Sequence, residues 1–185
     1  MSRDDDAIAA EKVVNGDIEA FHGIVRRNQG RLLSFARRFF RNIQDAEDFV
    51  QEVFLQAFRR LSTYRGDSRF ASWLLTVAYN LAIRIKRRKP DYASLESEEI
   101  PDTRGDPERS LVVADARRAV VRAIRSLPER FGTCVDMFFF FGMSYETISE
   151  TTGIPMNTVR SHIRRAKIIL RDSLEGNVPE ATSGM

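Results

Sequence analysis

Residues 144–170 constrain the fold most strongly, because their pattern predicts two short helices separated by a sharp turn. Ser144 suits the N-cap of the first helix. Gly153 stands where the chain must turn, and glycine adopts positive φ at little cost. Pro155 fits the first turn of the second helix, where its missing N–H is not needed. One apolar stripe then runs along the second helix and comprises Val159, Ile163, Ala166 and Leu170.

The side of the second helix that faces away from this stripe carries hydrogen-bond donors, namely Arg160, Ser161, Arg164 and Arg165. A basic second helix braced by a first one is the helix-turn-helix arrangement, which enters the major groove of DNA. The alternative is a helical hairpin with a solvated basic side. The agreement between the glycine, the proline and the arginines favours DNA binding.

Composition and cysteine content exclude several classes of protein. The chain has 185 residues, 43% of them hydrophobic, and a net charge of +3, which suits one large or two small folded domains. Its single cysteine, Cys134, excludes an internal disulfide, so we expect a reducing, cytoplasmic location with this thiol in the core. The sequence shows no signal peptide and no apolar run of about 20 residues, so we expect no direct membrane insertion.

The patterns that usually mark catalysis or ion binding are missing from the sequence. Two histidines and one cysteine without ligand spacing predict no metal site. No glycine-rich phosphate loop and no nucleophile elbow occur, so we expect no cofactor. An enzyme acting on nucleic acid would need metal ligands or paired acid–base groups, and we therefore expect a protein that is not an enzyme.

The first half of the chain predicts four helices, at about 9–15, 17–41, 45–61 and 69–89. Asp17 is expected to cap the second of these, and Gly30 is a candidate interruption within it. The third is the cleanest, with apolar residues at i, i+3, i+4 and i+7. Its opposite side carries an acidic patch of Asp48, Gln51 and Glu52, which would repel DNA and suits a basic protein surface.

The fourth helix follows a polar loop at 62–68 and ends in five positive charges within residues 84–89. Such a run is either a phosphate contact or a solvated helix end. Asn80 lies off the apolar stripe of this helix, and its amide can pair with a base edge. This favours a nucleic-acid contact.

Residues 90–110 differ in character, with three prolines, no periodicity and a net charge of −5 from seven acidic and two basic residues. They predict an extended linker between two domains. Further helices are expected at 111–127 and 127–141, with the aromatic run 138–141 buried, and a disordered tail at 176–185. The predicted fold class is all-α, with two small helical domains joined by an extended acidic linker.

Three motifs carry a family resemblance. They are D-A-E-D-F-V-Q-E-V-F at 45–54, Y-R-G-D-S-R-F-A-S-W-L-L-T-V-A-Y-N at 64–80, and the segments L-P-E-R-F, M-S-Y-E-T-I and N-T-V-R-S-H-I-R-R-A between 127 and 166. In this order they resemble the core-polymerase-binding helix, the −10-reading segment and the −35-reading domain of sigma factors. The likeness spans about residues 17–171 and is to the extracytoplasmic-function (ECF) group of the sigma-70 family, which has sigma domains 2 and 4 only.

The resemblance implies a transcription initiation factor that binds core RNA polymerase, directs it to specific promoters and starts strand opening. Domain 2 would occupy residues 1–89, the linker 90–110, and domain 4 residues 111–175. The implied polymerase contacts are Asp48, Phe49, Gln51 and Glu52. The implied −10 contacts are Tyr64, Arg65, Asp67, Ser68, Asn80, Arg84 and Arg87. The implied −35 contacts are Asn157, Thr158, Arg160, Ser161, Arg164 and Arg165.

Reading the −10 element requires capture of an unstacked base, to which aromatic stacking contributes about 1–3 kcal/mol. Phe70 and Trp73 fall on the apolar stripe and are placed in the core, so Tyr64 is the exposed aromatic candidate. The resemblance also implies an anti-sigma factor as a partner, and passage of the acidic linker through the channels of the polymerase.

The alternative hypothesis is a stand-alone helix-turn-helix regulator that does not engage polymerase. Such regulators usually bind DNA as dimers, and the sequence shows no dimerisation heptads. This hypothesis also leaves the acidic patch without a role. Two features depart from the family: the aromatic run at 138–141, and Arg164 at a recognition position that varies among relatives, so the preferred −35 sequence is not implied.

Overall fold

The computed structural model describes residues 4–40, 42–88 and 119–175. Within these ranges the chain forms helices and turns and contains no strand, which confirms the predicted all-α class. None of the helices in the described ranges is long and apolar enough to cross a membrane. The predicted linker at 90–110 and tail at 176–185 lie outside the described residues.

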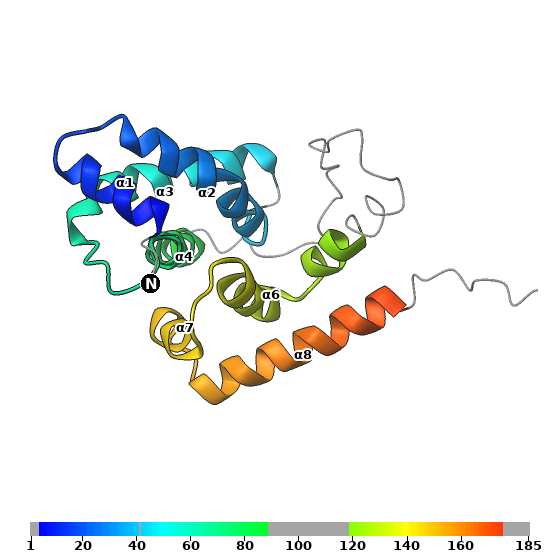
Figure 1. Ribbon diagram of the computed structural model, residues 1–185. Helices are drawn as coiled ribbons and strands as arrows, with labels where there is room; N and C mark the ends of the chain where they lie inside the picture. The colour runs from blue at the N-terminus through cyan, green and yellow to red at the C-terminus, as the bar shows by residue number, and fades with distance from the viewer. Residues whose placement is uncertain (1–3, 41, 89–118, 176–185) are drawn as a thin grey trace, which may run out of the picture.

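The first four helices pack as one unit, called here the N-terminal bundle (Figure 1). It consists of α1 (Asp5–Val14), α2 (Ala20–Ala36), α3 (Ile43–Arg59), the short 3-10 helix η1 (Leu61–Thr63) and α4 (Phe70–Arg88). The predicted stripe of α3 is confirmed, with its buried side chains Ala46, Phe49, Val50, Val53, Phe54 and Ala57. Phe58 lies on the same stripe but is 40% exposed.

Two details of α1 and α2 differ from the prediction. The first helix begins at Asp5 instead of residue 9, because the Asp4 side chain caps it by accepting a hydrogen bond from the backbone N–H of Asp6. Gly30 does not interrupt α2, which is continuous. Asp17 Oδ1 accepts a hydrogen bond from the backbone N–H of Ala20, so it caps the turn that leads into the helix.

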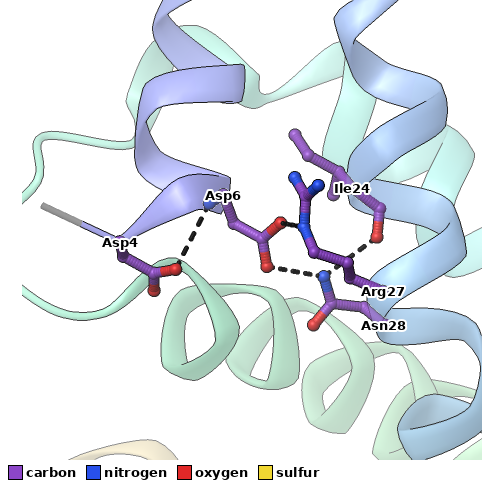
Figure 2. Close-up of polar contacts among 5 residues, drawn as sticks. All are labelled: Asp4, Asp6, Ile24, Arg27 and Asn28. Atoms are coloured by element: carbon purple, nitrogen blue, oxygen red, sulfur yellow. Dashed lines mark hydrogen bonds and ion pairs between the residues drawn. The ribbon is translucent and has the colours of Figure 1, made fainter.

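A buried polar cluster ties α1 to α2 (Figure 2). The Asp6 carboxylate accepts hydrogen bonds from Arg27 Nε at 2.6 Å and from Asn28 Nδ2 at 2.8 Å. Asn28 Nδ2 also donates to the carbonyl of Ile24 at 2.9 Å. Because buried polar groups are costly when unpaired, these bonds fix the position of α1.

The remaining helices form the C-terminal bundle (Figure 1). It contains a helical segment at 119–125, α6 (Glu129–Val135), the π-helical turn η3 (Asp136–Phe140), α7 (Tyr145–Thr152) and α8 (Met156–Glu175). The helix-turn-helix is formed as the sequence predicts. Ser144 Oγ accepts the backbone N–H of Thr147 at 3.1 Å, and Gly153 ends α7 with φ of +73°.

The prediction that the aromatic run 138–141 is buried is wrong for two of its four members. Phe139 is 51% exposed and Phe140 is 46% exposed, whereas Phe141 is buried. The π-helical turn widens the backbone here, because the N–H of Phe141 bonds to the carbonyl of Asp136 five residues back. The altered period turns the two middle rings toward solvent.

The two bundles pack against each other, an arrangement that sequence patterns do not indicate. One continuous apolar cluster includes Phe35 and Leu75 of the N-terminal bundle together with Met137 and Ile148 of the C-terminal bundle. Figure 1 shows α4 on the side of the N-terminal bundle that faces α6 and α7, and α4 contacts α7 directly. Helix α4 therefore lies at the interface between the bundles.

Candidate polymerase and nucleic-acid interfaces

The acidic patch lies on the solvent side of α3, as its spacing requires. Asp48 and Gln51 are exposed, and Glu52 is half-buried. Gln56 Nε2 donates to Glu52 Oε1 at 2.9 Å, which holds that carboxylate against the helix. The structure thus brings the three polar residues together on one accessible surface.

Phe49 does not belong to this surface. Its side chain is only 3% exposed, and its ring lies 5.0 Å from that of Phe40 between centroids. The predicted polymerase contact by Phe49 is therefore corrected to a core role, because residue 49 falls on the apolar stripe that faces the other helices. Phe49 contributes to the patch indirectly, because its buried ring packs α3 against the rest of the bundle.

The loop before α4 presents Arg65, Asp67 and Ser68 to solvent. Tyr64, predicted as the exposed aromatic, is instead half-buried. Its hydroxyl donates to the Ser68 carbonyl at 2.7 Å, and its ring packs 5.1 Å from Phe70. Tyr64 therefore closes the loop onto α4, while the predicted core position of Phe70 is confirmed by its complete burial.

The predicted −10 residues on α4 lie along one exposed face. Asn80, Arg84 and Arg87 are all exposed, in consecutive turns of the helix. They line a cleft of about 780 Å³ whose other wall is the turn of the helix-turn-helix, at Thr151 to Gly153. The cleft also involves Tyr79 and Ile83, which sequence reasoning missed, and Arg88, which belongs to the basic run at 84–89. No local pattern in the sequence places the α7 turn next to these residues.

Helix α8 presents the predicted −35 residues. Asn157, Arg160, Ser161, Arg164 and Arg165 are exposed and Thr158 is half-buried, while Val159, Ile163 and Ala166 are buried on the opposite side. The guanidinium of Arg160 lies 5.7 Å from the ring centroid of Tyr145, which orients it at the start of the helix. Ser161 Oγ donates to the carbonyl of Asn157 at 2.9 Å, so this hydroxyl is engaged with the backbone.

Two titratable groups lie behind the α8 surface. Cys134 is completely buried, which confirms its core position, and burial raises the pKa of this thiol to about 11. His162 faces it, with Nδ1 at 3.8 Å from the sulfur. Burial and the positive charges of Arg130 and Arg165 lower the pKa of His162 from its ordinary value of 6.5. The fold therefore favours the neutral imidazole, whose ring lies 5.2 Å from that of Phe131 between centroids.

These features define a helix-turn-helix protein whose other bundle carries an acidic surface unsuited to DNA. Comparison with known proteins gives the family. The family model for Sigma-70 region 2 matches residues 24–90 of the sequence, and the family model for Sigma-70 region 4 matches residues 117–170.

Two curated relatives span nearly the whole chain. The chain is 32% identical to the RNA polymerase sigma-H factor of Pseudomonas aeruginosa, with 98% of this chain and 100% of that protein covered. It is 35% identical to the ECF RNA polymerase sigma-E factor of Escherichia coli, with 88% and 90% covered. The chain therefore belongs to the ECF group of the sigma-70 family and is a sigma factor, which confirms the predicted family.

Two solved structures share the fold. The structure of CnrH in complex with the cytosolic domain of CnrY matches with a TM-score of 0.61 at 23% identity, covering 95% of this chain and 100% of that one. The sigma factor RpoE of Bartonella quintana, in complex with the anti-sigma factor NepR, matches with a TM-score of 0.62 at 21% identity, covering 85% and 98%.

Proposed function

We propose that this sigma factor binds core RNA polymerase through the acidic patch on α3, reads the −10 element with α4 and its preceding loop, and reads the −35 element with α8. Residues 1–89 and 111–175 would be sigma domains 2 and 4. The observation that carries the proposal is the exposed set Asp48, Gln51 and Glu52. A negative surface repels phosphate but complements a basic protein surface, so it has a purpose only if the chain also binds a protein.

The DNA contacts follow from the chemistry of the exposed faces. Arg84 and Arg87 supply positive charge for phosphates, and Asn80 offers both a donor and an acceptor to a base edge. On α8, the arginines project from a helix of the length and position that enter a major groove. The half-buried Tyr64 is a weaker stacking candidate than its position in the sequence indicates, because its hydroxyl is already bonded to the loop.

Partners and location follow from this role. A chain that works with RNA polymerase acts in the cytoplasm and needs no catalytic group of its own. One structural match, RpoE, is bound to the anti-sigma factor NepR, and the other, CnrH, is bound to the cytosolic domain of CnrY. We infer that the exposed interfaces of this chain are likewise covered by an anti-sigma factor when it is inactive.

The test is co-elution of the purified protein with core polymerase on a sizing column. Glu52→Arg reverses a charge within the patch and should abolish co-elution. Glu150→Arg makes the same change on an exposed site of α7 and should leave it intact. Equal binding by both variants would remove α3 from the interface. A folded wild-type protein that does not bind core at all would instead favour the stand-alone regulator.

A further inference from the structure

We propose that Tyr145 is a positioning residue for −35 recognition, because it holds the Arg160 guanidinium in the orientation that reads a base. This inference rests on the proposed role of α8 at the −35 element. It adds a residue that acts through Arg160 without contacting the base itself. It also gives a role to the aromatic run at 138–141, in which the chain departs from the family.

Three aromatic rings form a continuous strip beside the recognition helix α8, called here the aromatic strip. The rings of Phe138 and Tyr145 are stacked, with centroids 4.9 Å apart and an angle of 17° between their planes. Phe139 meets Phe138 edge to face, also with 4.9 Å between centroids. Phe138 and Tyr145 are partly buried against the apolar core, so the strip is anchored to the folded protein.

The turn between η3 and α7 brings the stacked rings together. Gly142 has φ of +66°, a conformation that other residues rarely adopt. The N–H of Met143 donates to the carbonyl of Met137 at 3.0 Å and closes the turn. The reversal of the chain places Phe138 beside Tyr145. Because Tyr145 is the first residue of α7, its backbone is fixed by that helix.

The aromatic strip contacts α8 through two cations. The guanidinium carbon of Arg160 lies 5.7 Å from the ring centroid of Tyr145, and Lys167 Nζ lies 5.4 Å from that of Phe139. An aromatic face attracts a cation within about 6 Å of its centroid. Arg160 and Lys167 are seven residues apart, which is about two turns of one helix face. The contacts at both ends therefore fix the strip relative to α8.

A carboxylate also lies near Arg160. Glu146 follows Tyr145 in the first turn of α7 and is exposed. Hydrogen bonding to its own backbone N–H and to Ser144 lowers the pKa of Glu146, and the positive charge of Arg160 lowers it further. The ionised carboxylate disfavours a phosphate at this end of α8. A base edge is therefore the better partner for Arg160.

Holding the guanidinium matters because an arginine side chain has many rotamers. A free side chain loses this freedom when it binds, and the loss opposes binding. A free guanidinium also reaches phosphates, and phosphate contacts carry no sequence information. A guanidinium that already rests on Tyr145 loses less freedom when its planar fork meets the two acceptors of a base edge. Tyr145 should therefore increase the preference for the correct −35 sequence.

The competing explanation is that Tyr145 only packs α7 against the core. The two explanations differ in whether the effect of Tyr145 depends on Arg160. A packing role would affect DNA binding whether or not Arg160 is present, whereas a positioning role disappears when Arg160 is removed. A double-mutant cycle measures this dependence.

The experiment uses the full chain in complex with core RNA polymerase. A duplex is first selected with the wild-type holoenzyme from a library that is randomised at the −35 element. Dissociation constants are then measured on the selected duplex and on a duplex with a scrambled −35 element. The variants are Tyr145→Leu, which removes the ring but keeps apolar bulk, Arg160→Ala, and the two substitutions combined.

We expect Tyr145→Leu to weaken binding to the selected duplex by about threefold to tenfold, and to change binding to the scrambled duplex by less than about twofold. In the Arg160→Ala background, the same substitution should change binding to the selected duplex by less than about twofold. An equal loss on both duplexes, or a loss that persists without Arg160, would make Tyr145 a packing residue and overturn the inference.

Conservative and control variants separate the aromatic strip from general damage to the turn. Tyr145→Phe keeps the ring and should bind the selected duplex within about twofold of the wild type. Phe138→Leu removes the ring on which Tyr145 stacks and should reproduce part of the loss. Phe140→Leu is the matched control, because this ring is exposed in the same π-helical turn outside the strip. Equal losses for Phe138→Leu and Phe140→Leu would count against the strip.

A measurement on the wild-type chain does not depend on the folding of any variant. NMR relaxation of the arginine Nε–H groups reports how far each guanidinium moves on the ps–ns timescale. Arg160 should be more restricted than Arg164, which is exposed on the same helix, and equal mobility would overturn the inference. If Arg160 is restricted but Arg160→Ala binds the selected duplex as tightly as the wild type, the proposed −35 role of Arg160 fails, and the inference fails with it.

Discussion

Asn28 Nδ2 donates a hydrogen bond to Asp6 Oδ2 at 2.8 Å, and this bond joins α2 to the first helix of the chain (Figure 2). Asp6 is 5% exposed and Asn28 is fully buried. The same carboxylate accepts from Arg27 Nε. The N-terminal helix is therefore attached through a polar cluster as well as through its apolar residues.

Replacing the carboxylate should destabilise the N-terminal bundle. We expect Asp6→Ala to lower the free energy of unfolding by about 1–3 kcal/mol, because the buried Asn28 amide loses one of its two acceptors and Arg27 loses its ion pair. Urea denaturation followed by circular dichroism measures this. The control, Asp5→Ala, changes an exposed acidic residue in the same turn and should stay within about 0.5 kcal/mol. Similar losses for both variants would contradict a specific role of the cluster.

Two glycines in helical regions should respond oppositely to alanine. Gly153 has φ of +73°, so Gly153→Ala should cost about 1–2 kcal/mol. Gly30 lies within the continuous helix α2, and a Cβ atom added there would have open space around it, so Gly30→Ala should stabilise the protein by about 0.5–1 kcal/mol. Thermal denaturation of the two variants measures these changes in stability. A change of the same sign in both variants would refute the assigned backbone conformations.

Features held by interactions between residues close in the sequence were predicted well, and features held by interactions between distant residues were not. The cap at Ser144 and the turn at Gly153 were predictable because their bonds lie within a few residues. Gly30 was misjudged because the modest cost of one glycine in a helix is outweighed by packing of the apolar residues around it. Arg38 and Asp136 form a buried ion pair although they are 98 residues apart, and neither position carries a local signal of the other.

The two misplaced aromatic predictions have separate causes. Tyr64 was expected at the surface because it lies in a polar loop, but the loop folds back onto Phe70 and Trp73. Phe139 was expected inside because a helical period was assumed, and the π-helical turn breaks that period. In both cases the local path of the backbone, which the pattern of apolar residues does not fix, decides whether the ring meets solvent.

Arg160 should contribute sequence-specific binding at the −35 element. In the holoenzyme, Arg160→Ala should weaken binding to a preferred −35 duplex by about 1–3 kcal/mol and less on a mismatched duplex, if the guanidinium reads a base. The control is Arg171→Ala. Arg171 lies near the other end of α8 beside Asp172 and Glu175, so its replacement should have little effect on binding to either duplex. An equal loss on both duplexes for the Arg160 variant would make that residue a phosphate contact.

His162 should make the C-terminal bundle less stable in mild acid. Burial and the charges of Arg130 and Arg165 lower its pKa below 6.5 in the folded protein, so the unfolded state binds the proton more readily. The free energy of unfolding should therefore fall as the pH drops below about 6.5, and level off beneath the folded pKa. His162→Gln cannot titrate, and it should lose less stability than the wild type between about pH 7.5 and about pH 5.5.

The comparison of pH slopes isolates His162 from other groups. Asp136, whose pKa is raised by burial against the opposing effect of Arg38, titrates in both proteins and cancels in the difference. Urea denaturation at each pH gives the slopes, and an NMR titration of the imidazole gives the pKa directly. A pKa at or above 6.5, or identical slopes in the two proteins, would contradict the prediction. A lowered pKa with a steeper wild-type slope would show that protonation of the ring between Cys134 and Phe131 destabilises the C-terminal bundle.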